Sequence, residues 1–267
     1  GLIVCLTVGL NAGKAIAGSL KKPFVAVNHL EGHALSPKIN NKIKFPYLLL
    51  LISGGHTQFL EVNGVNNYKR LGTTIDDALG EAFDKTAKLL GIEFPGGPQI
   101  EQWAKKGDEN YFKLPKPIFK KGGCNLSFAG LKTAVLRTSK EIKNQKEKYH
   151  LAASFQKTIN EILYEKTKVA MEEFSKNKVN NQKNFVIAGG VAANLKIREN
   201  LTNLAIQKNF SAIFPPINLC GDNAAMIAWA GINRYKINLV DDLKFPSKAR
   251  WPLDSSAPFL KGPGLRL

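Results

Sequence analysis

The chain has 267 residues, 44% of them hydrophobic, which is enough for a substantial core in one large domain or two smaller lobes, and we expect two lobes. Lysine and arginine total 38 against 21 acidic residues, so the formal net charge is +17 and the surface should attract polyanions such as nucleic acid. The lysines are scattered rather than clustered, so charge alone supports a nucleic-acid partner only modestly.

The cysteines and the apolar runs indicate the cellular compartment in which the chain works. Cys5, Cys124 and Cys220 are far apart and form no C-x-x-C pair, which argues against a disulfide framework or a zinc knuckle and favours a reducing, cytoplasmic environment. The longest apolar run, residues 47–52, is too short to span a bilayer, and no signal peptide is visible. We therefore expect no membrane partner.

Helical and extended stretches alternate along the chain with glycine-rich turns between them, which predicts an α/β fold. Residues 4–20 have a helical pattern, and residues 24–27 form a short apolar stretch typical of a buried strand. A second helix is expected from His29, ending with the help of Pro37. The histidine thus follows a strand directly, which is where open α/β sheets place ligand-binding groups.

His29 and His33 are four residues apart, so on a helix their imidazoles share one face and can hold a single metal ion. Glu31 lies between them but does not directly follow the first histidine, so the H-E-x-x-H pattern of zinc peptidases is absent. Two histidines at helical spacing also often only pack or cap a helix. The pair alone therefore leaves metal binding and packing equally open.

Residues 47–52 predict an apolar strand, and residues 58–62 a returning one, so the pair indicates a hairpin. The turn between them contains Gly54 and Gly55, whose bare backbone can approach phosphate oxygens closely and direct N–H groups at them. The alternative is an ordinary hairpin turn. The triplet Ser53-Gly54-Gly55, taken by itself, favours this alternative.

Residues 74–90 give the clearest helical pattern, with Thr74 and Asp77 resembling a capping box and Gly91 ending the helix. One face is acidic, because Asp77, Glu81 and Asp84 follow each other at steps of four and three. Either Lys85 and Lys88 neutralise these carboxylates, or the carboxylates accept the hydroxyls of a ligand.

A glycine-rich loop and a long helical region follow in the middle of the chain. Residues 94–98 predict a rigid loop with exposed glycine backbone, and a sugar could lie between this loop and Asp84. Residues 103–183 are lysine-rich and mostly helical, with a turn at 127–132 and a long helix at about 151–174. We find no catalytic constellation within them.

Residues 184–188 predict a strand, Gly189 and Gly190 a tight turn, and residues 191–204 a helix with Asn194 near its start. Glycines at such a turn let a flat base lie against the backbone, and the Asn194 amide both donates and accepts hydrogen bonds. This strand, turn and helix fits a nucleotide site, although many α/β turns share the pattern.

Asp222 precedes an alanine-rich helix and stands at its expected N-cap position. A simple cap is the better explanation for an isolated aspartate in this place. A carboxylate is, however, the ligand type that two neutral imidazoles lack, and two histidines with one carboxylate are the common set for Fe²⁺. Asp222 is therefore the candidate third ligand beside His29 and His33.

Seven motifs in this order resemble one family across nearly the whole chain: the tRNA threonylcarbamoyladenosine transferases, once described as glycoproteases or O-sialoglycoprotein endopeptidases. Each motif could arise by chance, but their joint occurrence is very specific. They are V-N-H-L-E-G-H at 27–33, L-I-S-G-G-H-T-Q at 51–58, I-D-D-A-L-G-E-A-F-D-K at 75–85, F-P-G-G-P at 94–98, S-F-A-G-L-K at 127–132, A-G-G-V-A-A-N at 188–194 and G-D-N-A-A-M at 221–226.

The resemblance implies an actin-like ATPase fold, shared with sugar kinases and hsp70-type chaperones, with two lobes and a nucleotide between them. It implies division into a first-lobe remainder at 1–46, a second lobe at 47–221, and a C-terminal helix and tail at 222–267 that return to the first lobe. Gly1 to Ile3 would align inside a later segment of the family, so the first strands of that lobe and their phosphate loop would be missing. We expect such a fragment to be insoluble or inactive alone.

The resemblance also assigns roles to residues. A metal, Fe²⁺ in the cell and Zn²⁺ as a possible substitute in vitro, would be held by His29, His33 and Asp222. The remaining positions would bind the substrate: Leu51, Ile52, Ser53, Gly54 and Gly55 the phosphate and acyl part, Asp84, Gly97 and Glu101 the ribose, and Gly190 with Asn194 the adenine. No catalytic side chain is implied, and the metal with the backbone of Gly54 and Gly55 would activate the carbonyl.

The activity implied is transfer of threonylcarbamoyl from threonylcarbamoyl-AMP to N6 of the adenosine beside the anticodon, in tRNAs that read codons beginning with A. The implied partners are tRNA, a catalytically inactive paralogue and a P-loop ATPase. A metalloendopeptidase, a small-molecule kinase of the same fold and a non-enzymatic RNA-binding scaffold are the alternatives.

Two positions depart from the family pattern. Gly221 stands where relatives usually have threonine, so the surroundings of the metal-binding aspartate could be looser. Leu51 stands where archaeal and eukaryotic relatives carry a ligating tyrosine, and an alkyl chain cannot coordinate a metal. The chain therefore looks bacterial, with one more open position at the metal.

Overall fold

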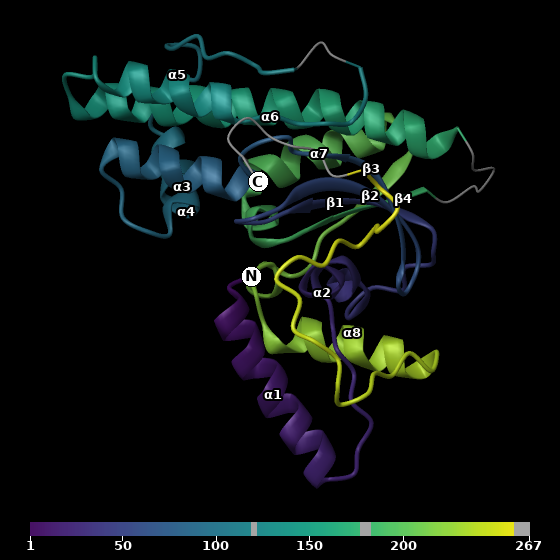
Figure 1. Cartoon of the computed structure of the whole chain (residues 1–267). Helices are drawn as coiled ribbons and strands as arrows, with labels where there is room; N and C mark the ends of the chain where they lie inside the picture. The colour runs from purple at the N-terminus through teal and green to yellow at the C-terminus, as the bar shows by residue number, and fades with distance from the viewer. Residues whose placement is uncertain (119–121, 177–182, 259–267) are drawn as a thin grey trace.

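The computed structural model describes residues 1–118, 122–176 and 183–258. Within them, a five-stranded sheet has the order β3-β2-β1-β4-β5 (Figure 1). The strands are β1 (Tyr47–Ile52), β2 (Thr57–Gly64), β3 (Asn67–Thr73), β4 (Lys183–Ala188) and β5 (Phe210–Ile213). β2 pairs antiparallel with β1 and β3, whereas β4 runs parallel to β1 and β5. Because β1 and β4 are parallel neighbours, their carboxyl ends lie at the same edge of the sheet.

β1 is completely buried, and its side chains alternate between two hydrophobic clusters. Leu48, Leu50 and Ile52 belong to the larger cluster, and Leu49 and Leu51 to the smaller one. A continuous apolar run of this kind is expected for a strand that is covered on both faces. The sheet is therefore the middle layer of the molecule.

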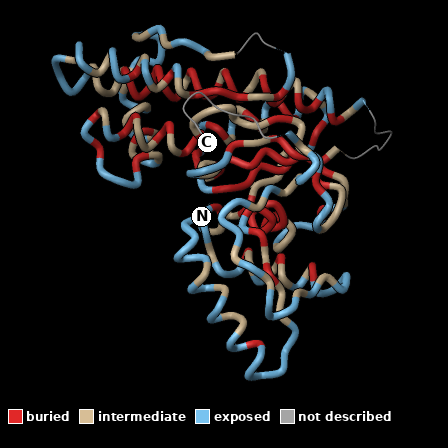
Figure 2. The backbone as a smooth tube through the Cα atoms, in the orientation of Figure 1, coloured by how far each residue is buried: buried red, intermediate tan, exposed pale blue. Residues whose placement is uncertain are grey.

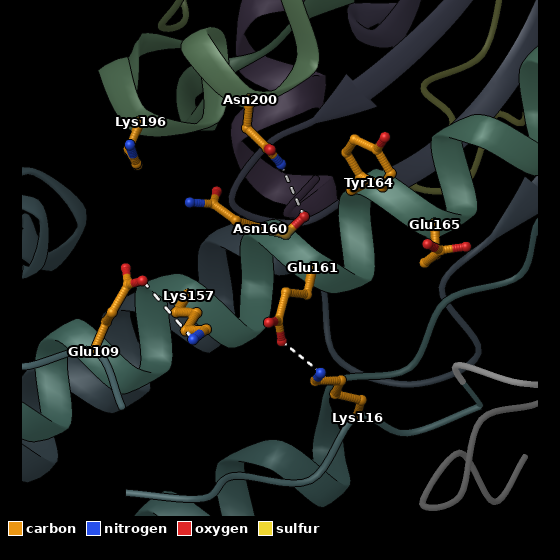
Figure 3. Close-up of a pocket in the computed structure, with 9 residues that line it drawn as sticks. All are labelled: Glu109, Lys116, Lys157, Asn160, Glu161, Tyr164, Glu165, Lys196 and Asn200. Carbon is orange, nitrogen blue, oxygen red and sulfur yellow. Dashed lines mark hydrogen bonds and ion pairs between the residues drawn. The ribbon is translucent and has the colours of Figure 1, made fainter. Parts of the chain in front are cut away.

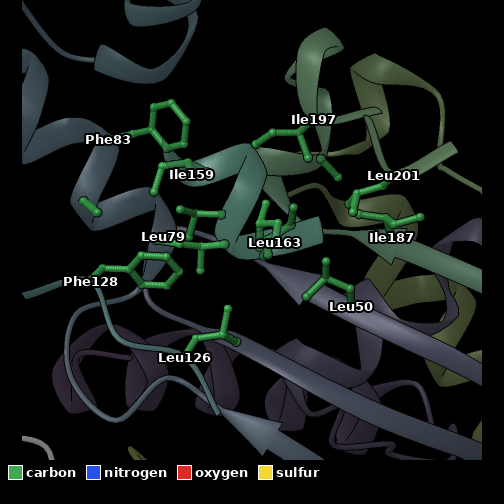
Figure 4. Close-up of a cluster of buried hydrophobic side chains, with 14 of the residues drawn as sticks. Leu50, Leu79, Phe83, Leu126, Phe128, Ile159, Leu163, Ile187, Ile197 and Leu201 are labelled. Atoms are coloured by element: carbon green, nitrogen blue, oxygen red, sulfur yellow. The ribbon is translucent and has the colours of Figure 1, made fainter. Parts of the chain in front are cut away.

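The larger cluster lies beneath a helical layer (Figures 1 and 4), in which Phe83, Ile159 and Ile197 converge on Leu50 and Ile187 of the sheet. The long helix was expected at 151–174 and extends further at both ends. The helices of this layer are α3 (Leu79–Leu90), α4 (Gly96–Ala104), α5 (Ala129–Ser139), α6 (Gln145–Ser175) and α7 (Leu195–Gln207), the last preceded by the 3₁₀ turn Gly190–Ala193.

The opposite side of the sheet carries α2 (His29–Leu35) with the 3₁₀ turn Ser36–Lys38, followed outward by α8 (Ala224–Lys236) and α1 (Ile3–Ser19). α2 is almost wholly buried, whereas Ala17 alone is buried in α1 (Figure 2). Phe24 bridges to Asp241, and the Gly1 amine donates to the Ala249 carbonyl. The N-terminal residue and the segment at 241–249 therefore lie on this side, whereas the chain returns to β3 at Asp254 and Pro258. The division into 1–46, 47–221 and 222–267 stays a prediction, and its last nine residues lie outside the described ones.

Several sequence predictions of local structure are wrong, among them the loop at 94–98, because Gly96 already begins α4. No strand forms at 24–27, because the sheet does not reach it and the Ala26 N–H donates to the Asp241 carboxylate instead. The helix predicted at 74–90 begins only at Leu79, since Thr74 bridges to Leu126. The helix predicted at 191–204 begins at Leu195, after the 3₁₀ turn. The helix at 4–20, the hairpin and the strand at 184–188 are confirmed to within two residues.

None of the described helices combines the length and the apolar character that crossing a membrane requires.

Candidate metal centre and the turns beside it

Two imidazoles and one carboxylate meet at the start of α2. Asn28 caps this helix by accepting a hydrogen bond from the Leu30 N–H at 2.9 Å, which fixes where the helix begins. His29 and His33 then lie one turn apart with ring centroids 4.9 Å from each other. Oδ1 of Asp222 lies 3.2 Å from Nε2 of His29 and 3.0 Å from Nε2 of His33.

The N-cap of α8 is Asn223 and not Asp222, so that prediction is wrong. The Asn223 side chain accepts from the Met226 N–H at 2.8 Å, because its backbone is extended directly before the first helical residue. Asp222 is thereby left free of capping, and its carboxylate points at the two histidines. The same correction strengthens its candidacy as a ligand.

This donor set fits a metal ion. The ligand atoms of His29, His33 and Asp222 all lie within 4.8 Å of one another. The His33 side chain is 1% exposed and that of Asp222 75%, so the cluster is walled on one side and open to solvent on the other. Burial lowers the pKa of His33, and repulsion from His29 lowers it further. Asp222 raises this pKa, but by less, so the pKa stays below 6.5 and the imidazole is neutral at pH 7. Neutral imidazole is the form that coordinates a metal.

The two ring nitrogens of His33 have different surroundings. Its Nδ1 is buried and has no hydrogen-bond partner among the described residues, whereas Nε2 faces the carboxylate of Asp222. Nε2 is therefore the atom that would bind a metal. The usual partner for the other ring nitrogen of a metal-binding histidine is lacking here.

Glu31, between the two histidines, is not available as a general base. Its side chain is 1% exposed and forms an ion pair of 2.9 Å with Arg234. Its other oxygen accepts from the Tyr68 hydroxyl at 2.9 Å and the Asn66 N–H at 2.8 Å. A peptidase of the zinc type needs a free carboxylate beside the metal to activate water. The buried pair therefore removes the structural basis for the metalloendopeptidase alternative.

The turn after β1 exposes backbone as expected. The Ser53 N–H donates to the His56 carbonyl at 2.8 Å, which closes the turn. A Cβ added at Gly54 or Gly55 would meet nothing within 4 Å, so both face open space. Leu51 and Ile52 are different, because both side chains are fully buried in the sheet. Of the predicted run, Ser53, Gly54 and Gly55 are thus the residues accessible to a ligand.

His56 shows that this turn faces the histidine cluster. Its pKa is lowered by partial desolvation and by the charges of His29, the N-terminal amine and His33. Sequence reasoning did not select His56, although its place directly after the two glycines was an available signal. The metal ligands and the accessible turn therefore belong to one region.

Close contacts fix the turn from two sides. The Gly80 N–H, at the start of α3, donates to the Ser53 carbonyl at 3.1 Å, and a Cβ at Gly80 would lie 2.7 Å from Gly54 Cα. Gly189, after β4, has a φ of +98° and lies so close that a Cβ would be 2.4 Å from the Ile52 carbonyl oxygen. Gly190 faces open space. The two parallel strand ends thus bring both glycine turns together.

Asn194 and Glu101, both predicted to contact the nucleoside, hold the start of α7. Oδ1 of Asn194 accepts from the Ile197 N–H at 2.9 Å, and its amide donates to Oε1 of Gln156 at 2.8 Å. Oε1 of Glu101 accepts from the N–H groups of Leu195 at 2.8 Å and Lys196 at 3.1 Å. Both side chains therefore already have protein partners.

The acidic residues predicted to share one helix face, Asp77 before α3 and Glu81 and Asp84 within it, are largely neutralised, which was one of the two interpretations. Asp77 pairs with Lys132 at 2.7 Å and with Lys85 at 3.3 Å, and Lys85 also pairs with Glu81. Asp84 differs, because its Oδ1 accepts from the Gly96 N–H at 3.1 Å and so joins α3 to the start of α4. The neighbouring Gly97 faces open space.

Two hollows lie along α6 and the first turns of α7 and share Lys157, Asn160 and Lys196. One of about 560 Å³ also includes Glu101. The other, of about 450 Å³, is drawn in Figure 3, where Lys116 pairs with Glu161. Carboxylates pair with Lys116, Lys157 and Lys196, and none of the metal-ligand candidates lines the hollows.

Comparison with known proteins agrees with this arrangement. The family model for tRNA N6-adenosine threonylcarbamoyltransferase (TsaD) matches residues 1–229. The chain belongs to this family. The transferase of Pelagibacter ubique is 71% identical over 267 residues, covering 100% of this chain and 75% of the relative. That of Rhodospirillum rubrum is 50% identical over 268 residues, covering 99% and 74%.

A solved structure shows the same fold. The crystal structure of full-length HypF in the phosphate- and nucleotide-bound form matches with a TM-score of 0.62 and 13% identity, covering 84% of this chain and 37% of that one. The shared α/β fold is consistent with the actin-like ATPase fold that the sequence resemblance implies. Family membership makes the protein a tRNA-modifying acyltransferase of threonylcarbamoyladenosine synthesis, with tRNA as its substrate.

Proposed function

We propose that this transferase moves threonylcarbamoyl from threonylcarbamoyl-AMP to N6 of the adenosine beside the anticodon, in tRNAs that read codons beginning with A. His29, His33 and Asp222 hold a metal at the reaction site. The observation that carries the proposal is the donor set itself, whose three ligand atoms lie within 4.8 Å of one another. The open Gly54–Gly55 backbone supports it, because the neighbouring His56 is near enough for the charges of His29 and His33 to lower its pKa.

The adenylate would lie along the edge formed by the ends of β1 and β4. Ser53, Gly54 and Gly55 meet the phosphate and acyl part, because a Cβ at either glycine would face open space and the bare backbone can approach phosphate oxygens. Gly190 faces the adenine and Gly97 the ribose, since neither carries a side chain to exclude a ligand. Asp84, Glu101 and Asn194 support these positions while they hold the neighbouring helix starts.

The reaction is an acyl transfer that balances without a redox partner. The N6 amine attacks the carbamoyl carbonyl carbon, a C–N bond forms, and the C–O bond of the mixed anhydride breaks. AMP leaves with the electron pair, and one proton from N6 passes to solvent. The N–H groups of Gly54 and Gly55 donate to the oxygen on which negative charge develops. No side-chain nucleophile is required.

A bound metal would supply Lewis acidity at the carbonyl or phosphate oxygen. Two histidines and a carboxylate with open positions favour Fe²⁺, and Zn²⁺ accepts the same donors. Leu51 is buried in the smaller cluster and would offer a bound metal no further ligand. The ring of His33 is almost completely buried, so the surrounding side chains fix its orientation before a ligand binds.

Two protein partners complete the proposal: a catalytically inactive paralogue and a P-loop ATPase, as the resemblance implies. The net charge of +17 favours the approach of tRNA, because each phosphate contact releases counterions.

The test is transfer in an extract of bacteria depleted of their own transferase, which supplies the partners. The full chain is added with threonylcarbamoyl-AMP and unmodified tRNA, and the modified nucleoside is measured by mass spectrometry. We expect product from the unaltered chain and a loss of at least about 100-fold for His33→Ala and for Asp222→Ala, as for removal of a main electrostatic contributor. Full activity of both variants would overturn the metal-centred proposal.

A control separates loss of chemistry from loss of fold. Glu173→Gln removes an exposed ion pair with Lys176, 2.7 Å long, on a distant part of α6. It should leave transfer unchanged. Modified tRNA that forms from the added adenylate without release of AMP would exclude threonylcarbamoyl-AMP as the donor.

A further inference from the structure

A buried ion pair lies on the opposite side of α2 from the histidines. Glu31 is two residues from His29 and two from His33, which places it about 200° around the helix from each. Its carboxylate is 2.9 Å from Nη1 of Arg234, in the last turn of α8, with side chains 1% and 7% exposed. The two residues are 203 positions apart. α2 therefore presents its histidines on one side and is anchored to α8 on the other.

The pair is part of a node that also includes the sheet. The Tyr68 hydroxyl and the Asn66 N–H donate to Oε1 of Glu31 at 2.9 and 2.8 Å. Nη1 of Arg234 donates to Oδ1 of Asn66 at 3.2 Å. Asn66 and Tyr68 belong to the turn between β2 and β3 and to β3 itself. The node thus ties the metal-binding helix, α8 and the sheet together.

A second contact between the helices lies at Gly32. A Cβ there would be 2.9 Å from Cδ1 of Ile227 and 3.3 Å from Cγ of Met226, so α2 and α8 touch closely in the first turn of α8. Arg234 is about 12 Å further along α8, at a rise of about 1.5 Å per residue. A helix held at two separated points cannot rotate or slide. Asp222, two residues before the first residue of α8, is therefore held at a defined place.

We propose that the Glu31–Arg234 ion pair is a positioning element that holds Asp222 against His29 and His33 and thereby sets the metal affinity of the centre. The pair does not touch the metal. It acts through α8, as the partners that orient metal ligands do in other proteins. This inference rests on the metal centre of the proposed function.

The experiment measures binding of Co²⁺ and Zn²⁺ by calorimetry, and the visible spectrum of the Co²⁺ form, in the full chain. Glu31→Gln keeps the shape but removes the charge, and Arg234→Lys keeps the charge but loses the planar fork. Each should weaken metal binding about 10- to 100-fold, the range for loss of a ligand-orienting partner. The spectrum should shift as the carboxylate contact weakens. Glu173→Gln is the matched control and should bind as the unaltered chain does.

A double-variant cycle separates positioning from general loosening of the fold. In an Asp222→Ala background, Glu31→Gln should cause no further loss of affinity, because the group that it positions is absent. Equal losses in both backgrounds would overturn the proposal, as would unchanged affinity of Glu31→Gln in the original chain. Should Glu31→Gln fail to fold, Arg234→Lys provides the same comparison. An unaltered chain that binds neither metal would refute the metal centre itself, a different result.

Discussion

Oδ1 of Asp222 lies 3.0 Å from Nε2 of His33, although 189 positions separate the two residues. The next residue, Asn223, caps α8 and has no contact with the histidines among its hydrogen bonds. Neighbouring residues therefore have separate tasks, one toward the proposed metal and one toward helix stability.

Asp222→Ala should weaken metal binding strongly without eliminating it, and should lower the free energy of unfolding in the absence of metal by no more than about 1 kcal/mol, because the side chain is exposed and caps nothing but accepts a hydrogen bond from His33. Asn223→Ala should cost about 1 kcal/mol, as loss of an N-cap does. Urea unfolding and metal titration of both variants check this. Strong destabilisation by Asp222→Ala alone would show a structural role instead.

Gly80→Ala should disturb the turn after β1. The new Cβ would lie 2.7 Å from Gly54 Cα and from the Ser53 carbonyl oxygen, and these backbone atoms cannot move aside cheaply. We expect a loss of about 1–3 kcal/mol in stability and a larger fractional loss of transfer. Gly9→Ala, in an open stretch of α1, is the control and should stabilise by about 0.5–1 kcal/mol. Normal transfer by Gly80→Ala would contradict the role of this turn.

Asn194→Ala should lower stability by about 1–2 kcal/mol, because it removes the cap of α7 and leaves Oε1 of Gln156 without its partner. Asn144→Ala removes a comparable cap from α6, where Asn144 accepts from the Glu147 N–H at 2.9 Å. Both variants should unfold more easily. A raised KM for the adenylate is expected in Asn194→Ala only, and equal KM values would remove Asn194 from the proposed nucleotide contacts.

The pH dependence of stability should include a contribution from Asp77. Burial tends to raise its pKa, but hydrogen bonds and charges from Lys132 and Lys85 outweigh this, so its pKa lies below the usual 3.8. A carboxyl group with a lowered pKa in the folded state stabilises fully above pH 3.8 and loses this contribution as the pH falls through the lowered value. Asp77→Asn should therefore unfold at lower temperature near pH 6, and the difference should shrink below pH 3.8. Melting curves against pH measure both.

The three thiols should differ in reactivity. Cys5 is exposed, whereas Cys124 and Cys220 are buried. Burial raises the pKa of Cys124 to about 11 and also raises that of Cys220, which suppresses the reactive thiolate. Iodoacetamide near pH 8 should label Cys5 rapidly and the other two only after denaturation, as peptide mass spectrometry would show. Rapid labelling of Cys124 in the folded protein would contradict its burial.

Local patterns were sufficient where the structure depends on near neighbours. The four-residue spacing of His29 and His33 predicted their common face, and the apolar run of β1 predicted a strand. The cap of α8 was assigned one residue early, because Asp222 and Asn223 are both good caps and only the backbone conformation distinguishes them. Because two histidine ligands lack a carboxylate, the sequence predicted Asp222 beside them, and the distances of 3.2 and 3.0 Å agree with this prediction.

Long-range partners could not be predicted in this way. The first N–H of α3 donates to the hydroxyl of Thr57 on β2 at 2.8 Å, so a side chain from another element, rather than Thr74, determines where this helix begins. The pairing of Glu31 with Arg234 likewise depends on how two helices pack. The residues next to each partner in the sequence contain no pattern that would predict either contact.

The placement of the metal ligands has a consequence for synthesis of the protein. His29 and His33 leave the ribosome early, and every strand of the described sheet follows them before Asp222 does. The sheet can therefore assemble around an incomplete donor set, and the third ligand arrives only with the segment that leads into α8. Tight metal loading would thus report that translation has proceeded past Asp222, so a chain released earlier would remain metal-poor and distinguishable from the finished protein.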